Sequence, residues 1–181
     1  MAEEVRYHVP LMHAFRDAYR KGDSRRSPRD DGEDRAPSEA EAVRRRGLSE
    51  TQIRDTVLED IGAILSTVDL QSAVEIDDLP HVSRSILNFG LYDIMHLTSE
   101  DSRVSEIERN IVAALLCYEP RIRRDSLQVE WSQRIDDVQQ KIRLSISAEV
   151  DSRPVNIPVD FTAEVDLSAC TAVIARGAER K

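Results

Sequence analysis

The sequence is poor in the residues that anchor several common classes of protein. Aromatic residues make up only 4% of the 181 positions, so any hydrophobic core must consist mainly of Ile, Leu, Val and Ala. Two cysteines, Cys117 and Cys170, are too few for a disulfide scaffold, and their apolar neighbours predict buried free thiols in a reducing compartment. No apolar run approaches the roughly 20 residues that cross a bilayer, so we expect no direct membrane insertion.

Basic surface charge is also scarce in the part of the chain that looks folded. The net charge is −9, and residues 49–181 hold 14 Lys and Arg against 24 Asp and Glu. A nucleic-acid-binding surface needs clustered basic residues, so this class of partner is excluded. The first eight residues lack the basic start and apolar stretch of a secretory signal, and we therefore expect a cytoplasmic protein.

Catalytic and cofactor motifs are missing as well. The chain has no phosphate-binding loop, no dinucleotide-binding glycine pattern, no nucleophile elbow and no zinc-protease helix motif. Its four histidines are scattered without the spacing of metal ligands. We therefore expect no enzyme activity, no cofactor and no metal.

Composition divides the chain into three parts: residues 1–21, 22–47 and 48–181. In the first, Leu11, Phe15 and Tyr19 recur every four residues, which predicts a short amphipathic helix that docks either on its own domain or on a partner. Residues 22–47 are rich in Gly, Pro, Ser and charge, and we predict a disordered linker there because so little apolar surface can be buried. The third part carries the regular patterns of a folded domain.

Two long helices are predicted between residues 48 and 121. Ser49 and Gln52 have the spacing of a capping box at the start of the first helix. Gly62 interrupts this helix at a cost of about 1 kcal/mol relative to Ala. The side chains expected on its inner face are Ile53, Val57, Ile61, Ile64, Leu65 and Val68.

The second helix should begin near Ser99–Ser102 and become apolar on all sides from Ile111 to Tyr118. Between the two helices, Ser83 is expected to cap a single turn, and Asn88 or Gly90 to end it with a left-handed residue. Pro120 stops the second helix because proline cannot continue it and disfavours helical geometry in the preceding residue.

Residues 126–176 alternate between apolar and polar side chains over long runs, as strands with one buried face do. Residues 151–154 have the chemistry of a turn between the two longest runs. Pro158 cannot donate to a strand ladder, so we expect its strand to be a sheet edge or to carry a bulge there. The predicted fold is α+β, with two long helices packed on one face of a mostly antiparallel sheet of about four strands.

An acid and a base, Glu119 and Arg121, flank the proline that ends the second helix. One interpretation is a helix end with a local ion pair. The other is that Glu119, Pro120 and Arg121 form a partner-binding elbow, because a charge pair on a preorganised turn loses little freedom on binding.

The order of these elements resembles a known family. The block Ser-Ile-Leu-Asn-Phe-Gly-Leu at 85–91 and the block Tyr-Glu-Pro-Arg-Ile at 118–122, each following a helix, are similar to those of TssE, the small baseplate wedge subunit of bacterial type VI secretion systems. That family is in turn similar to the wedge protein of contractile phage tails. The resemblance covers residues 48–176. Gly62 stands where the family commonly has Glu, which weakens its older "lysozyme-like" label.

The resemblance implies a structural role in a baseplate that docks at the inner membrane. The partners it implies are the other baseplate wedge subunits, through the elbow at Glu119, Pro120 and Arg121, and the contractile sheath subunits, through an open sheet edge. The machine itself is left open between a secretion system and a phage-like contractile tail. A peptidoglycan hydrolase and a free-standing acidic adaptor are the alternatives of other classes.

Overall fold

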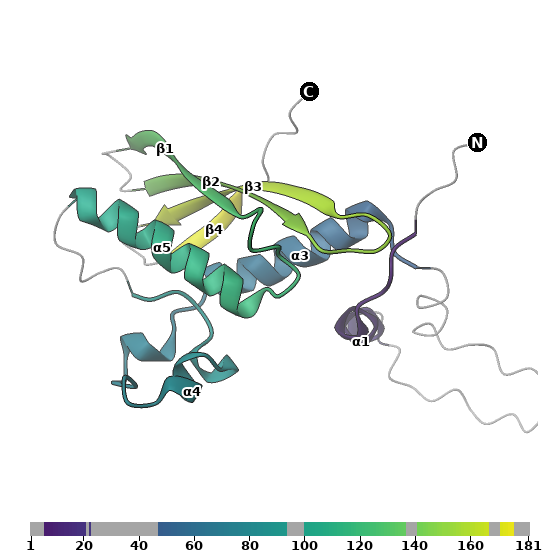
Figure 1. Ribbon diagram of the computed structural model, residues 1–181, viewed down its shortest axis with the longest axis horizontal. Coiled ribbons are helices and arrows are strands. Elements are labelled where there is room, and N and C mark those ends of the chain that lie inside the picture. The colour runs from purple at the N-terminus through teal and green to yellow at the C-terminus, as the bar shows by residue number, and fades with distance from the viewer. Residues whose placement is uncertain are drawn as a thin grey trace, which may run out of the picture. The chain divides into compact units, whose positions relative to one another are not determined.

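The computed structural model describes residues 6–20, 22, 47–93, 100–136, 141–166 and 171–175 (Figure 1). The chain forms two compact units. The smaller comprises Met1–Thr56 with Ser152–Val155, and the larger comprises Val57–Asp151 with Asn156–Lys181. Residues 23–46, which make up most of the predicted linker, lie outside the described residues.

The smaller unit joins the N-terminal segment to the start of helix α3 (Glu50–Leu65). Tyr7 and Leu48 exchange two backbone hydrogen bonds of 2.9 and 3.0 Å, and both side chains are buried. The predicted capping box is confirmed: the Ser49 amide donates to Gln52 Oε1 at 2.9 Å, and the Gln52 amide donates to Ser49 Oγ at 3.3 Å. Two of the donors that a helix start leaves without partners are thereby satisfied.

The predicted N-terminal helix is confirmed as α1 (Leu11–Arg20). Within the smaller unit, His13 Nδ1 lies 3.1 Å from Thr56 Oγ1, and that hydroxyl donates to the Gln52 carbonyl at 2.8 Å. Because a threonine hydroxyl has one hydrogen, His13 is the donor in this contact. Phe15 and Tyr19, two of the three apolar residues in the predicted pattern, are exposed.

The larger unit is built on a four-stranded antiparallel meander, ordered β1-β2-β3-β4 (Figure 1). The strands are β1 (Gln128–Asp136), β2 (Lys141–Val150), β3 (Ile157–Asp166) and β4 (Thr171–Ala175). Side chains along β3 alternate between buried and more exposed, as period-2 patterning requires. The predicted sheet is therefore confirmed, including its fourth strand.

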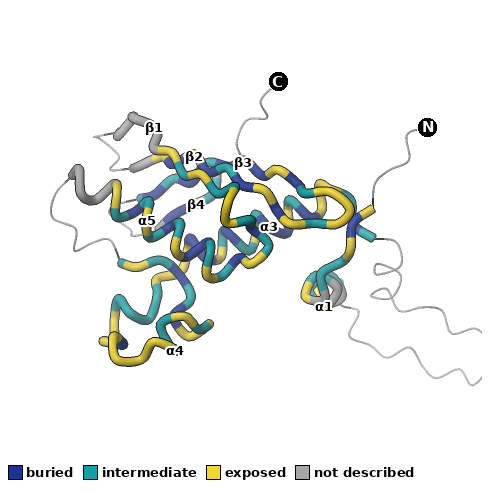
Figure 2. Tube along the Cα trace, viewed as in Figure 1, coloured by how far each residue is buried: buried dark blue, intermediate teal, exposed yellow. Residues whose placement is uncertain are grey.

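Helix α3 and helix α5 (Glu100–Tyr118) cover one face of this sheet, so the predicted α+β class is confirmed (Figure 1). Figure 2 shows the buried positions gathered between the helices and the strands. Gly62 does not break α3; a Cβ there would lie 3.7 Å from Cδ1 of Ile174 on β4. The largest fully buried side chains of this unit are Ile61, Ile64, Leu65, Ile111, Leu115, Leu144, Ile146, Ile157, Val57 and Val150.

The connection between the two long helices contains η1 (Leu70–Ser72), α4 (Pro80–Ser83) and η2 (Ile86–Asn88). The prediction that Ser83 caps the single turn was wrong. Ser85 caps η2, and Ser83 is the last residue of α4. Gly90 is the residue with positive φ, at +134°, and a Cβ there would lie only 2.4 Å from the Thr67 carbonyl oxygen. Any other residue would therefore displace this close backbone contact.

Three further predictions need correction. Val68 is exposed, because α3 ends at Leu65 and Val68 instead forms an isolated parallel bridge with Leu91. Cys117 was predicted to be buried, but it is an exposed free thiol. It lies four residues after exposed Ala113, so both residues are on the outer face of α5, and the helix is not buried on all sides. Cys170 lies outside the described residues.

Pro158 does not mark an edge strand, because β3 lies between β2 and β4. However, β4 pairs only with Thr162–Asp166, so the part of β3 that contains Pro158 has no β4 residue beside it. The edge character predicted from Pro158 is therefore local, as far as the described strands show.

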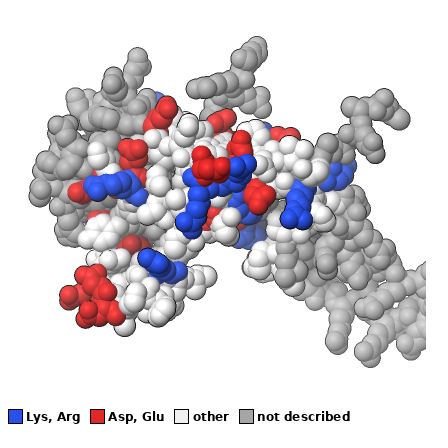
Figure 3. All heavy atoms as spheres, in the orientation of Figure 1, with Lys and Arg blue, Asp and Glu red and all other residues white. Residues whose placement is uncertain are grey.

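Charged side chains of opposite sign lie next to one another at several places on the visible face (Figure 3). An acidic group stands apart in the part of the chain around α4, where Glu75, Asp77 and Asp78 are exposed. No helix in the described ranges is long and apolar enough to span a membrane. Within the same ranges, no three acidic, histidine or cysteine side chains gather as a metal site would require.

Candidate functional site

The elbow after α5 is a β-turn with proline in its favoured position. Glu119 donates the last helical amide bond, to the Leu115 carbonyl at 2.9 Å. Ile122 then donates its amide to the Glu119 carbonyl at 3.1 Å, which closes a four-residue turn with Pro120 second. Proline suits this position because its fixed φ matches the turn and no amide is needed there.

The far side of the elbow is tied to the end of strand β2. Ile122 bridges Val150 in antiparallel fashion, the Asp151 amide donates to the Arg121 carbonyl at 2.7 Å, and the Arg123 amide donates to the Glu149 carbonyl at 2.9 Å. The backbone of Arg121 is therefore held between a helix end and a strand end, which limits its motion.

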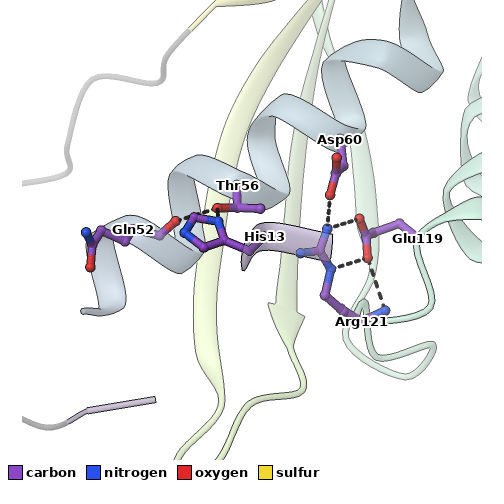
Figure 4. A network of polar contacts seen from close by, with 6 residues as sticks. All are labelled: His13, Gln52, Thr56, Asp60, Glu119 and Arg121. Atoms are coloured by element: carbon purple, nitrogen blue, oxygen red, sulfur yellow. Dashed lines mark hydrogen bonds and ion pairs between the residues drawn. The ribbon is translucent and has the colours of Figure 1, made fainter. Parts of the chain in front are cut away.

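The two charged side chains of the elbow face each other (Figure 4). Arg121 Nε donates to Glu119 Oε1 at 2.6 Å, and Arg121 Nη2 donates to Glu119 Oε2 at 2.5 Å. This is the two-pronged geometry that an arginine fork and a carboxylate favour. The Arg121 backbone amide also donates to Glu119 Oε1, at 3.2 Å. The predicted local ion pair is therefore present.

A third residue, Asp60 of α3, completes the cluster. Its Oδ2 accepts a hydrogen bond from Arg121 Nη2 (Figure 4). The Glu119 side chain is only 3% exposed, whereas those of Arg121 and Asp60 are 23% and 24% exposed. The cluster therefore joins the first long helix to the end of the second, and both Arg121 and Asp60 are partly exposed.

Burial by itself lowers the pKa of Arg121, but the hydrogen bonds and negative charge of Glu119, together with those of Asp60, outweigh it and the pKa lies above its usual value. Arg121 thus carries its charge at any physiological pH. Its Nε–H and both Nη2 hydrogens are engaged by the two carboxylates, and no described residue accepts from Nη1.

Sequence reasoning identified Glu119, Pro120 and Arg121 but missed Asp60. Asp60 lies 61 positions from Arg121, and only its place at the margin of the apolar face of α3 hinted at a partly buried role. An acid next to core positions such as Val57, Ile61 and Ile64 needs a partner when it is drawn inward. The sequence pattern of α3 therefore indicates that Asp60 needs a partner, but it does not identify Arg121 as that partner.

A family model described as Baseplate wedge protein gp25 matches residues 51–155, which include Asp60, Glu119 and Arg121. The chain belongs to this family. The gp25 family consists of structural baseplate proteins, so the chain is a structural wedge subunit of a contractile injection system. No curated protein and no solved structure matches the chain.

Membership of the gp25 family implies baseplate proteins as assembly partners in general. Glu119 is too deeply buried to touch a partner, and its contacts hold the guanidinium in place. The exposed parts of the elbow are Pro120 and the outer portion of Arg121.

Proposed function

We propose that this chain is the TssE-type wedge subunit of a type VI secretion system. In this role it joins the other wedge subunits to the first ring of the contractile sheath and helps to initiate sheath assembly in a cytoplasmic baseplate docked at the inner membrane. The sequence blocks at 85–91 and 118–122 support this choice. A wedge protein of a phage-like contractile tail is the alternative within the same family. The genes next to this one distinguish the two machines.

The elbow is the proposed contact with the other wedge subunits, and the observation that carries this is the clamped guanidinium of Arg121. Three of its five N–H groups are held by Glu119 and Asp60, so the side chain is already fixed before a partner arrives. A fixed side chain loses little conformational entropy on binding. The two N–H groups of Nη1 are then left as donors for a partner, and Glu119 acts as the positioning residue.

The test compares two lysine substitutions in the same turn region. Arg121→Lys keeps a positive charge between Glu119 and Asp60 but removes the Nη1 donors. Arg124→Lys makes the same change at an exposed residue with no described partner. We expect Arg121→Lys to fold but to bind the purified wedge subunits about tenfold more weakly, because an interfacial charge-assisted contact is lost. Arg124→Lys should bind like the wild type.

Arg121→Ala gives a different result. It leaves Glu119 buried without a counter-charge, and breaking such a pair costs about 3 kcal/mol, at the low end of its range because Arg121 and Asp60 are partly exposed. Urea unfolding should show this loss. If Arg121→Lys is folded and binds the wedge subunits as tightly as the wild type does, then the cluster is only structural and the elbow is not the contact.

A further inference from the structure

The sheet ends in two edge strands, β1 and β4, which differ in how well they are protected against pairing with another strand. An edge strand presents unpaired backbone groups, and proteins protect such edges with charged residues, prolines and irregularities in the strand. β1 carries Glu130, Arg134 and Asp136. Its pairing with β2 is also irregular between Ser132 and Asp136. The β1 edge therefore has features that oppose strand addition.

The described part of β4 has none of these features. Its five residues, Thr171–Ala175, include no charge and no proline, and they pair in unbroken register with Thr162–Asp166 of β3. No described residue forms a backbone hydrogen bond with the outer side of β4. A short, uncharged strand that is rich in β-branched residues is open to pairing at this edge.

The sequence of β4 is complementary to a second copy of itself. In an antiparallel pair with a two-fold axis at Val173, the two copies of Val173 lie opposite each other, and Ala172 lies opposite Ile174. This register pairs all five residues of both strands. Because the axis passes through the middle residue, the outward amides of one copy meet the outward carbonyls of the other, whichever alternate residues they belong to.

The side chains of β4 favour this register on both faces of the sheet. Val173 is 64% exposed, and a second Val173 would cover part of it. On the face that packs against the helices, Ile174 is half-buried, and a Cβ at Gly62 of α3 would lie 3.7 Å from its Cδ1. Ala172 of the second copy would lie beside Ile174 on this face. The pairing would therefore add an apolar contact on each face.

We infer that the isolated chain forms a two-fold dimer in which β4 pairs with the β4 of a second copy, so that two four-stranded sheets become one. This pairing goes beyond the proposed function and does not depend on it. Its consequence rests on the proposed function: the dimer occupies an open edge of the kind that the sheath contact requires, so it must separate before a sheath strand can add there. Only five residues of each copy pair, so we expect a weak dimer that a sheath subunit can displace.

Sedimentation velocity of the full chain at increasing concentration tests the pairing. The wild type should dimerise with a Kd on the order of 100 µM, as expected for a small interface. Val173→Lys and Val173→Glu should each raise this Kd about tenfold or more, because like charges would face each other across the two-fold axis. An equal mixture of the two variants should dimerise again, because opposite charges then meet. Val155→Lys, at a valine that is 61% exposed outside the strands, is the matched control and should dimerise as the wild type does.

Both substitutions at Val173 should leave the fold intact. Glu164, the β3 residue opposite Val173, accepts from Arg143 Nε through Oε1 at 2.8 Å, so a charge of either sign would lie beside an ion pair that is already neutralised. Unfolding midpoints equal to that of the wild type check this expectation. If Val173→Glu fails to fold, the comparison of Val173→Lys with Val155→Lys still decides whether β4 forms the dimer.

The outcomes separate this inference from the proposed function. A wild type that stays monomeric overturns the inference and leaves the proposed function standing. A dimer that persists in folded Val173→Lys, or a mixture of the two folded variants that stays monomeric, shows that β4 is not paired in this register and also overturns it. If the wild type dimerises through β4 but the purified sheath subunit neither binds nor separates the dimer, the pairing stands and the sheath contact of the proposed function fails.

Discussion

Tyr118 is the residue through which helix α5 contacts the turn that carries Ile86 and Leu87. Its hydroxyl donates to the Asn88 carbonyl and lies 3.3 Å from the Ser85 carbonyl oxygen. Burial, with smaller contributions from the nearby acidic groups Cys117 and Asp69, raises the pKa of Tyr118 to about 12. The neutral phenol is therefore favoured in the folded state, and ionisation would also remove the hydrogen that these contacts use.

The direction of this pKa change predicts a loss of stability at alkaline pH. The pKa is 10.0 in the unfolded chain and about 12 in the folded one, so the Tyr118 contribution is complete below pH 10 and is lost as pH rises from 10 to about 12. At pH 8, Tyr118→Phe should lower the free energy of unfolding by about 1 kcal/mol, the net value of a typical hydrogen bond.

Urea unfolding of the wild type and Tyr118→Phe across this range checks the prediction. The difference between them should shrink above pH 10, because the wild type alone loses the phenol contribution. Tyr92→Phe, at an exposed tyrosine, is the control and should follow the wild type. A difference that stays constant to pH 11.5 would show that folding does not change the pKa of the Tyr118 hydroxyl.

Residue-level predictions from the sequence succeeded where partners are close in the chain. Glu119 and Arg121 lie on either side of one proline, so their ion pair follows from local geometry. The contact with Asp60 depends on how α3 and α5 lie on the sheet, and no local pattern contains that information. Cys117 was misplaced for a related reason: its neighbours are apolar along the chain, but the helix turns its side chain to the outer face.

At the scale of elements, local signals again gave the reliable predictions. The capping box at Ser49 and the alternation along β3 involve neighbouring residues, and both are confirmed. The strand that holds Pro158 was predicted to be a sheet edge or to carry a bulge there. A proline lacks an amide donor only at its own position, so it does not show that the whole strand lies at an edge. The described part of β4 is five residues long and pairs with Thr162–Asp166, so no described β4 residue lies beside Pro158.

The sheet offers an edge at β4 for the proposed sheath contact. A strand from a sheath subunit could add there through main-chain hydrogen bonds, which require outward-facing amides. Successive amides on a strand point to opposite sides, so Val173→Pro and Ile174→Pro remove one outward amide and one that faces β3. The variant that removes the amide facing β3 should lose stability. The variant that removes the outward amide should keep the wild-type unfolding midpoint but no longer bind the sheath subunit.

Thr162→Ala is the control for this test, because it changes a side chain of β3 without changing any backbone amide. It should leave sheath binding nearly unchanged. Strand addition at β4 is the wrong mechanism if the proline variant that remains folded binds the sheath subunit normally. Added hydrogen-exchange protection on the helices alone would lead to the same conclusion.

At the scale of the whole molecule, the domain predicted at residues 48–181 stays a prediction. The family match covers residues 51–155, and the division into compact units falls after Thr56. The linker predicted at residues 22–47 rests on composition alone, since residues 23–46 lie outside the described part of the chain. The two-unit division also places Ser152–Val155 with the N-terminal residues, a long-range arrangement that local patterns do not encode.

Limited trypsin digestion tests the domain boundary directly. Residues 22–47 contain seven arginines, and the composition there predicts that trypsin cuts these before Arg54 and Arg109, which lie within helices. Mass spectrometry should show an early, persistent fragment that begins at Gly47. Equal rates of cutting at Arg54 and within residues 22–47 would contradict the predicted boundary.

That fragment should be folded but less stable than the full chain, because it loses the N-terminal segment that pairs with Leu48. Leu48 is only 2% exposed in the full chain and exchanges two backbone hydrogen bonds with Tyr7. Removing residues 1–46 uncovers Leu48, and the free energy of unfolding should fall by about 1.5–3 kcal/mol, as expected for exposing one aliphatic side chain. Tyr7→Ala in the full chain should reproduce most of this loss, whereas Tyr19→Ala, at an exposed residue of α1, should not. If Tyr7→Ala has no effect on unfolding, the N-terminal segment does not stabilise the start of α3.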